Sequence, residues 1–168
     1  MAELKRKEKI IPLEVYTDGS CKKRGIQTFG AWAYVIVKDG KILTQDSGSS
    51  PNSTNQRMEL LAAIKGLEAA DMIKQPLENI ILYSDSAYLI NCYSQEWYIG
   101  WRANGWKNAA RKEVANQDLW IKLVPYFEKF GYIFKKVKGH ADNLYNNLCD
   151  EMAQREAEQC KINWRGQE

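Results

Sequence analysis

Long apolar runs are absent from this sequence of 168 residues, and none approaches the roughly 20 residues that a membrane-spanning helix needs. The amino-terminal stretch MAELKRKEK also lacks the apolar segment of a secretory signal peptide. These absences argue against an integral membrane protein and against a secreted one. We therefore expect a cytoplasmic protein with no membrane partner.

Metal-binding side chains of the softer kind are scarce. The sequence has four cysteines without C-x-x-C spacing and a single histidine. This pattern argues against a zinc site and against a disulfide framework, so we expect reduced thiols. The net charge of +3 is too small to indicate a nucleic-acid partner by itself.

The remaining composition is ordinary, with 45% hydrophobic and 27% charged residues, as in a typical globular protein. A chain of this length buries one core, so we expect one domain. Residues 1–10 read as a charged, flexible arm, residues 11–160 as the folded domain, and residues 161–168 as a C-terminal tail. Nothing in the pattern demands more than a monomer.

The central stretch of the chain is LEVYTDGSC, which begins at Leu13. Its alternating β-branched and aromatic residues predict a strand. The pair Asp18-Gly19 predicts a tight turn that ends this strand, since Asp-Gly allows a positive φ. Taken alone, such a pair is more often a hairpin turn than a catalytic site. The turn would place the carboxylate of Asp18 at a strand end.

The expected elements alternate between strands and helices. Loops are expected at residues 22–30 and 48–54, and a two-residue turn at Asp39-Gly40. We expect strands at residues 13–18, 31–37, 41–47, 79–84 and 132–137, and the principal helices at residues 56–72, 118–130 and about 146–160. This order predicts an α/β domain with a five-stranded mixed sheet and helices packed on both faces.

Glu59 lies in the first predicted helix on a stripe of small residues, namely Ala62, Ala63, Gly66 and Ala70. Such a stripe allows the helix to lie close against a sheet, whereas a solvent-exposed face is the alternative. The helix start has two candidate caps, Ser53 and Asn55, and Gln56 is placed to complete a capping box with Ser53.

Two further acids occupy similar positions. Asp85 follows the strand at residues 79–84, where its alternative role is to cap a helix that begins near Ala87. Asp150 is expected in the first turn of the last helix, capped by Asn146 or Asn147, where an acid also favours the helix dipole. It shares a stripe with two alanines, as Glu59 does.

Residues 97–116 are basic and aromatic, with one acid among them. Aromatic faces interleaved with cations are typical of a nucleic-acid groove. The alternative is that tryptophans belong to the core, which we expect for Trp97 and Trp120. The candidate binding residues are Trp101, Trp106, Lys107, Arg111 and Lys112.

If Asp18, Glu59, Asp85 and Asp150 converge at one sheet edge, their mutual repulsion requires cations. Hard oxygen ligands select Mg²⁺, with Mn²⁺ as a substitute, over Zn²⁺. Beside a basic groove, such a cluster predicts two-metal phosphoryl transfer.

Five segments of the chain resemble the signature segments of the ribonuclease HI family and follow in the family's order. They are TDGSC from Thr17, NQRMEL from Asn55, SDS from Ser84, VKGHA from Val137 and CDEMA from Cys149. The resemblance runs from about Leu13 to Glu158 and implies a ribonuclease H-like fold. It also implies an endonuclease that cuts the RNA strand of RNA–DNA hybrids, leaving 3′-hydroxyl and 5′-phosphate ends.

The resemblance further implies the roles of individual residues. Asp18, Glu59, Asp85 and Asp150 would bind Mg²⁺, and His140 would assist proton transfer or product release. The minor groove of the hybrid would contact Gly19, Ser20, Cys21, Asn55 and Gln56, and Thr54 would contact a DNA phosphate. The basic protrusion at residues 97–116 would hold the DNA strand.

The chain departs from the family at residues 22–29, where KKRGIQTF replaces the Gly/Pro-rich loop of many bacterial members. Contacts of that loop cannot be carried over. Two alternative functions stay open, namely a non-catalytic hybrid-binding module and a DNA-directed nuclease of the same fold.

Overall fold

The computed structural model describes residues 9–130, 133–136 and 143–166. A five-stranded mixed sheet forms its centre, with the strand order β3-β2-β1-β4-β5. The strands are β1 (Leu13–Arg24), β2 (Gln27–Lys38), β3 (Lys41–Pro51), β4 (Ile80–Ser84) and β5 (Ile133–Lys136). β2 pairs antiparallel with both β1 and β3, whereas β4 pairs parallel with both β1 and β5. The predicted mixed sheet of five strands is confirmed.

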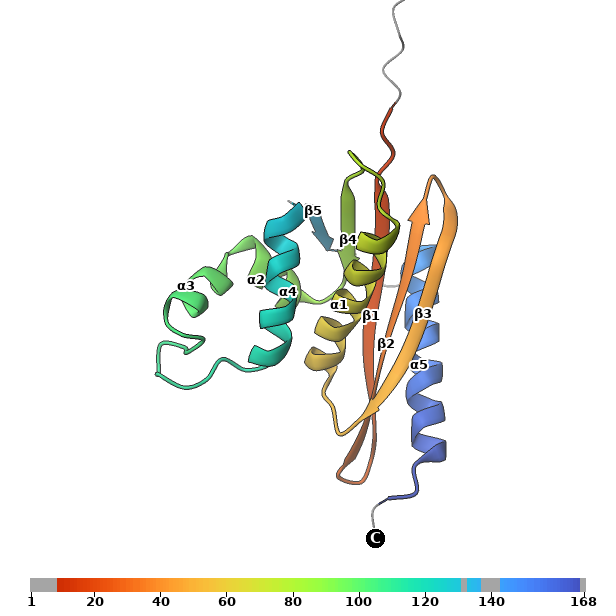
Figure 1. Ribbon diagram of the computed structural model, residues 1–168. Coiled ribbons are helices and arrows are strands. Elements are labelled where there is room, and N and C mark those ends of the chain that lie inside the picture. The colour runs from red at the N-terminus through yellow and green to blue at the C-terminus, as the bar shows by residue number, and fades with distance from the viewer. Residues whose placement is uncertain (1–8, 131–132, 137–142, 167–168) are drawn as a thin grey trace, which may run out of the picture.

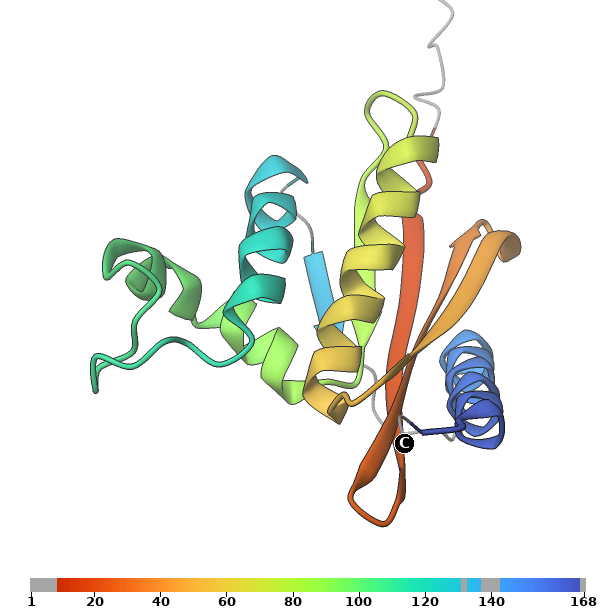
Figure 2. The same cartoon turned by 60° about the horizontal axis from the view of Figure 1, so that its bottom comes forward.

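Helices cover both faces of the sheet (Figure 1). They are α1 (Asn55–Ile73), α2 (Ala87–Ser94), α3 (Trp97–Ala103), α4 (Gln117–Phe130) and α5 (Leu144–Asn163). α1 lies against β1 and β2 on one face, and α5 lies on the opposite face (Figure 2). Within the described ranges no helix is long and apolar enough to cross a bilayer.

The small-residue stripe of α1 makes the close packing that its sequence predicts. Ala62, Ala63 and Ala70 are fully buried. A Cβ at Gly66 would lie 2.8 Å from Cγ1 of Val15 on β1. On the other face, Ala153 and Ala157 of α5 are also fully buried. Both predicted helix–sheet contacts are therefore confirmed.

The predicted turn at Asp18-Gly19 is wrong. Asp18 pairs with Ala33 inside the β1–β2 ladder, which continues to Arg24 opposite Gln27. The predicted loop at residues 22–30 therefore forms a hairpin, and its turn is made by Gly25, with φ of +62°, and Ile26. Gly19 serves close packing, because a Cβ there would lie 2.3 Å from the backbone nitrogen of Glu59.

The loop predicted at residues 48–54 is also mostly wrong, since β3 continues to Pro51. Gly48 allows this continuation, because the Trp32 ring occupies the space of a side chain, with Cζ2 2.6 Å from the Cβ position. The turn at Asp39-Gly40 is confirmed, with φ of 51° and 72° as a type I′ turn requires.

The helix caps differ from the predicted ones by one to four residues. Thr54, in place of Ser53 or Asn55, caps α1 and accepts a hydrogen bond from Arg57 N at 3.2 Å. The N-cap of α5 is Asn143. Because α5 starts at Leu144, Asp150 lies in its second turn, not in the first.

Candidate active site

Two of the acids are brought together by the parallel pairing of β1 and β4. The last pair of this ladder is Tyr16 with Tyr83, and Asp18 and Asp85 each follow it by two residues. Since the two strands run in the same direction, these two carboxylates lie side by side where β4 ends. Ser86 caps α2 by accepting from Leu89 N, so the alternative capping role of Asp85 is excluded.

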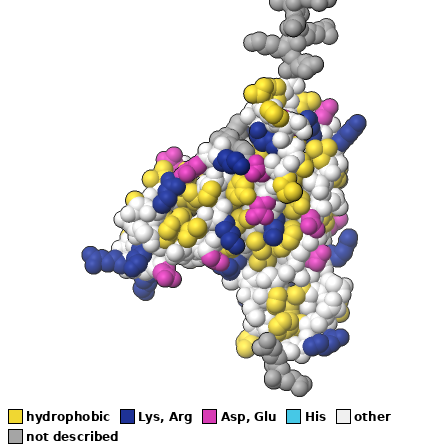
Figure 3. Space-filling view, in the orientation of Figure 1, with side chains coloured by type: hydrophobic (Ala, Val, Ile, Leu, Met, Phe, Trp, Pro, Cys, Tyr) yellow, Lys and Arg dark blue, Asp and Glu magenta, His cyan; other side chains and the backbone are white. Residues whose placement is uncertain are grey.

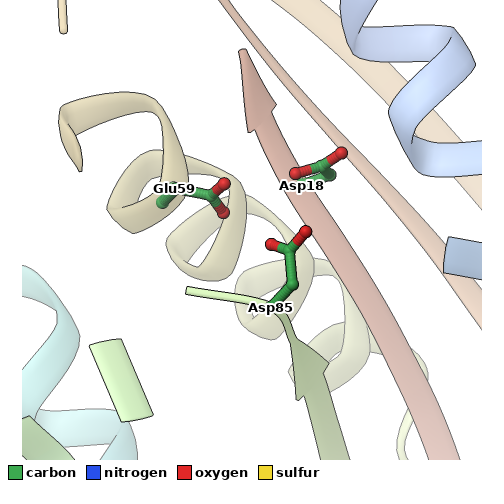
Figure 4. A group of neighbouring side chains, drawn as sticks. All are labelled: Asp18, Glu59 and Asp85. Atoms are coloured by element: carbon green, nitrogen blue, oxygen red, sulfur yellow. The ribbon is translucent and has the colours of Figure 1, made fainter. Parts of the chain in front are cut away.

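The third acid comes from α1. The absence of a side chain at Gly19 lets the backbone of Met58 and Glu59 rest directly on β1. One carboxylate oxygen from each of Asp18, Glu59 and Asp85 lies within 4.8 Å of the others. Figure 4 shows the three carboxylates converging from β1, α1 and the end of β4.

Burial makes this cluster unfavourable for negative charge. Burial and the charge of Asp85 raise the pKa of Asp18 to about 7. Burial and the charges of Asp18 and Asp85 raise the pKa of Glu59 to about 10. The Gly19 N–H donates to Oδ1 of Asp18 at 2.9 Å, but Glu59 Oε2 is buried without a partner among the described atoms. A divalent cation would provide the missing positive charge.

Asp150 is adjacent to this cluster without being part of the group of three. It extends from α5 on the other face of the sheet, and its charge contributes to the raised pKa of Asp18. Its Oδ2 accepts a hydrogen bond from Gln154 Nε2 at 3.0 Å. The predicted catalytic histidine, His140, lies outside the described residues.

The two segments expected to contact a hybrid do meet. Ser20 and Cys21 on β1 lie beside the start of α1, and the Cys21 thiol donates to the Ser53 carbonyl oxygen at 3.4 Å. A hollow of about 250 Å³ lies between the two segments, lined by Cys21, Lys23, Thr28, Ser53, Thr54 and Asn55. The next residue, Gln56, is exposed in the first turn of α1.

The basic protrusion divides into a packed part and an exposed part. The Trp101 ring packs against Trp120 at 5.6 Å and Trp106 at 6.5 Å between ring centroids. Trp120 is fully buried, as expected of a core residue, and Trp97 is partly buried. Three cations are exposed, namely Lys107, Arg111 and Lys112. The tryptophans therefore stabilise the protrusion, and its cations are accessible.

Sequence reasoning missed a link between α1 and the protrusion. Arg57, two residues before Glu59, donates to both carboxylate oxygens of Asp118 at 2.9 and 2.7 Å. It also donates to Asn116 Oδ1 at 3.4 Å. These partners are about sixty residues away in the sequence, so no local pattern indicates them.

Comparisons with known proteins agree with the geometry of the site. The family model described as RNase H matches residues 11–158. The ribonuclease H of Chlorobium phaeovibrioides is 46% identical over 139 residues, which are 83% of this chain and 90% of that protein. The ribonuclease H of Caldanaerobacter subterraneus is 45% identical over 141 residues, 84% of this chain and 88% of that protein.

Solved structures share the fold at lower identity. The foamy viral protease-reverse transcriptase in complex with RNA/DNA hybrid aligns with a TM-score of 0.79 and 19% identity, covering 95% of this chain and 22% of that chain. The PFV RNase H domain in solution aligns with a TM-score of 0.74 and 22% identity, covering 89% of this chain and 96% of that chain. From the family match and the close relatives together, the chain belongs to the ribonuclease H family.

Proposed function

We propose that this protein cuts the RNA strand of RNA–DNA hybrids internally, leaving 3′-hydroxyl and 5′-phosphate ends. The observation that carries the proposal is the convergence of Asp18, Glu59 and Asp85 at the edge of a ribonuclease H sheet. The hybrid as substrate is supported by the foamy viral relative, which was solved in complex with RNA/DNA hybrid.

The carboxylates suit Mg²⁺, with Mn²⁺ as a substitute, because all candidate ligands are hard oxygens and one buried oxygen has no partner among the described residues. Asp18, Glu59, Asp85 and, from α5, Asp150 would bind the metal. Bound divalent ions supply positive charge that stabilises the attacking and leaving oxygens of phosphoryl transfer. The protein's own part is to hold the ligands in place, as the Gly19 N–H does for Asp18.

His140 is proposed to assist proton transfer or product release, since an imidazole titrates near neutral pH. Gly19, Ser20, Cys21, Asn55 and Gln56 are proposed to contact the minor groove, where 2′-hydroxyls distinguish RNA from DNA. Thr54 is proposed to bind a DNA phosphate. Its hydroxyl oxygen accepts from Arg57 N, so its own proton is available to donate to the phosphate.

The proposed function predicts a narrow substrate range. One labelled sequence is offered as RNA–DNA hybrid, double-stranded RNA, double-stranded DNA and single-stranded RNA, each with Mg²⁺ and with EDTA. We expect cleavage of the RNA strand of the hybrid alone, and only with Mg²⁺. Tight hybrid binding without cleavage would make the protein a binding module, and cleavage of DNA would make it a DNA-directed nuclease.

The exposed cations of the protrusion predict a salt-dependent contact with the DNA strand. Replacing Lys107 and Arg111 together by alanine should weaken hybrid binding and reduce the slope of log K against log salt by about 0.9 for each phosphate that is no longer neutralised. Fluorescence anisotropy at several salt concentrations measures this slope. Lys41→Ala, at the distant β2–β3 turn, is the control and should leave it unchanged. An unchanged slope in the double variant would remove the protrusion from the interface.

A further inference from the structure

The hairpin formed by residues 22–27, here called the hairpin arm, extends well beyond the acid cluster. β1 continues for six residues past Asp18, which at about 3.3 Å per residue gives a reach of roughly 20 Å. The arm projects at the bottom of the molecule in Figure 1. It is also the segment where the resemblance to the family breaks down, so the family's contacts do not say what it binds.

Two of the three cations on the arm are used within the protein. Lys22 Nζ lies 3.1 Å from Glu158 Oε2 on α5. Arg24 donates to the carbonyl oxygens of Lys161 and Trp164 at 3.3 and 3.4 Å. These contacts join one side of the arm to the C-terminal part of α5 and use the charges of Lys22 and Arg24 within the protein.

The third cation faces the other way. Side chains alternate along a strand, so Lys23 lies on the side of the arm opposite to Lys22 and Arg24. It is exposed, and its side-chain ammonium group makes no hydrogen bond or ion pair with any residue that the structure describes. Its charge is therefore available to a binding partner.

Lys23 also lines the hollow of about 250 Å³ at the start of α1, which has no acidic residue among its described lining side chains. Ser53, only 6% exposed, lines the same hollow, and its hydroxyl has no partner within the described part of the chain. The first N–H groups of α1, on Asn55 and Gln56, have no acceptor inside the helix. The surroundings of Lys23 therefore favour an anionic, hydrogen-bond-accepting ligand.

The arm and the protrusion lie on two sides of the start of α1. Figure 2 shows α1 beginning between the loop that follows α3 and the β1–β2 hairpin. The space-filling view shows the surface hollowed between the lobe of α3 and the lower part of the molecule that carries the hairpin (Figure 3). An elongated ligand lying across this wider concave surface would meet the cations of the protrusion on one side and those of the hairpin arm on the other.

We propose that Lys23 binds a backbone phosphate of the nucleic-acid duplex, so that the hairpin arm is a second cationic contact across α1 from the protrusion. This inference rests on the proposed function, since it takes the RNA–DNA hybrid as the ligand. It assigns a phosphate contact to residues 22–27, the part of this chain that departs from the Gly/Pro-rich loop of many family members.

The test measures hybrid binding in the Asp18→Asn background, in which we expect cleavage to be suppressed, with EDTA in place of Mg²⁺ as a second way to prevent it. The proteins are this parent and its Lys23→Ala, Lys23→Arg and Lys22→Ala variants. The probe is a fluorescent RNA–DNA hybrid, titrated at several salt concentrations. Lys23→Ala should weaken binding a few-fold and lower the salt slope by about 0.9, as expected when one phosphate is no longer neutralised. Lys23→Arg should restore the slope, and Lys22→Ala, whose charge is paired with Glu158, should leave it unchanged.

The outcomes separate the two proposals. A parent protein that does not bind the hybrid refutes the proposed function, and the role of Lys23 with it. A parent that binds normally, with an unchanged slope in Lys23→Ala, overturns the role of Lys23 alone. An equal effect in Lys22→Ala also overturns it, since the effect would then come from net charge. Thermal melting of each variant confirms that the fold is intact, and Lys23→Gln replaces Lys23→Ala if that variant fails to fold.

Discussion

Replacing Asp18 by asparagine should reduce cleavage of the hybrid about a thousand-fold or more, equivalent to on the order of 4 kcal/mol of activation free energy. The reason is that Asp18 lies at the centre of the cluster, between Glu59 and Asp85 on one side and the charge of Asp150 on the other. An amide keeps the shape of the side chain but removes its charge. Initial rates at saturating Mg²⁺ measure the effect.

The same substitution should stabilise the metal-free protein at neutral pH. Folding raises the pKa of Asp18 from its ordinary value of 3.8 to about 7, and that of Glu59 from 4.5 to about 10. The folded state therefore holds protons that the unfolded state releases, and stability falls as pH rises from about 4 through these raised values. Asp18→Asn removes one of these titrating groups, so less stability is lost between about pH 4 and pH 7. The substitution should raise the melting temperature at pH 7, by roughly 2–4 °C for each kcal/mol gained in the free energy of unfolding.

Two comparisons make this prediction sharp. Mg²⁺ should raise the melting temperature of the wild-type protein more than that of Asp18→Asn, because a ligand that binds only the folded state stabilises it. Asp39→Asn, at the exposed β2–β3 turn, is the matched control, since asparagine also tolerates its positive φ. Normal cleavage by Asp18→Asn, or a lower melting temperature without metal, would contradict the proposed role of the cluster.

Replacing Gly19 by alanine should destabilise the protein by about 3 kcal/mol or more. The added methyl group would lie 2.3 Å from Glu59 N and 2.4 Å from the carbonyl carbon of Met58. Both atoms belong to the backbone of α1, so no side-chain rotation relieves the overlap. The helix must move away from β1, and Glu59 moves with it, so cleavage should fall as well.

Urea denaturation followed by circular dichroism measures the free energy of unfolding. Gly100→Ala is the matched control, because Gly100 lies in α3 with no described atom within 4 Å of the added methyl and with an ordinary φ. It should be neutral or stabilising by about 0.5–1 kcal/mol, since alanine favours a helix. A Gly19→Ala protein as stable as Gly100→Ala would show that α1 does not rest on this glycine.

Gly19 also shows what limited the sequence prediction. The pair Asp-Gly has the same local chemistry in a hairpin turn and in the middle of a strand, and here the contact that decides comes from α1, forty residues later. By contrast, the Asp39-Gly40 turn was predictable, because a strand pattern precedes and follows it. A turn was predictable from its own residues where no contact from a distant element determines the structure.

The site also contains features that local sequence predicts and features that depend on distant contacts. The positions of Asp85 at the end of β4 and of Glu59 and Asp150 in helices with small-residue stripes were predictable from pattern, whereas the position of Asp18 inside the β1–β2 ladder was not. Three of the four carboxylates converge as expected. The cap of α1 was not predictable, because Ser53, Thr54 and Asn55 are all chemically able to cap and the local sequence does not distinguish them. The Arg57–Asp118 pair left no trace in the sequence, since nothing local specifies a partner about sixty residues away.

The place of β1 between β2 and β4 has a consequence for synthesis on the ribosome. The β1–β2–β3 meander and α1 can assemble from the first half of the chain, since their contacts are local. Asp85 joins the cluster only after β4 pairs with β1, and Asp150 comes beside it only after α5 covers the opposite face. A nascent chain that ends before α5 therefore carries an unfinished set of acids, and nuclease activity should begin only when almost the whole domain has left the ribosome.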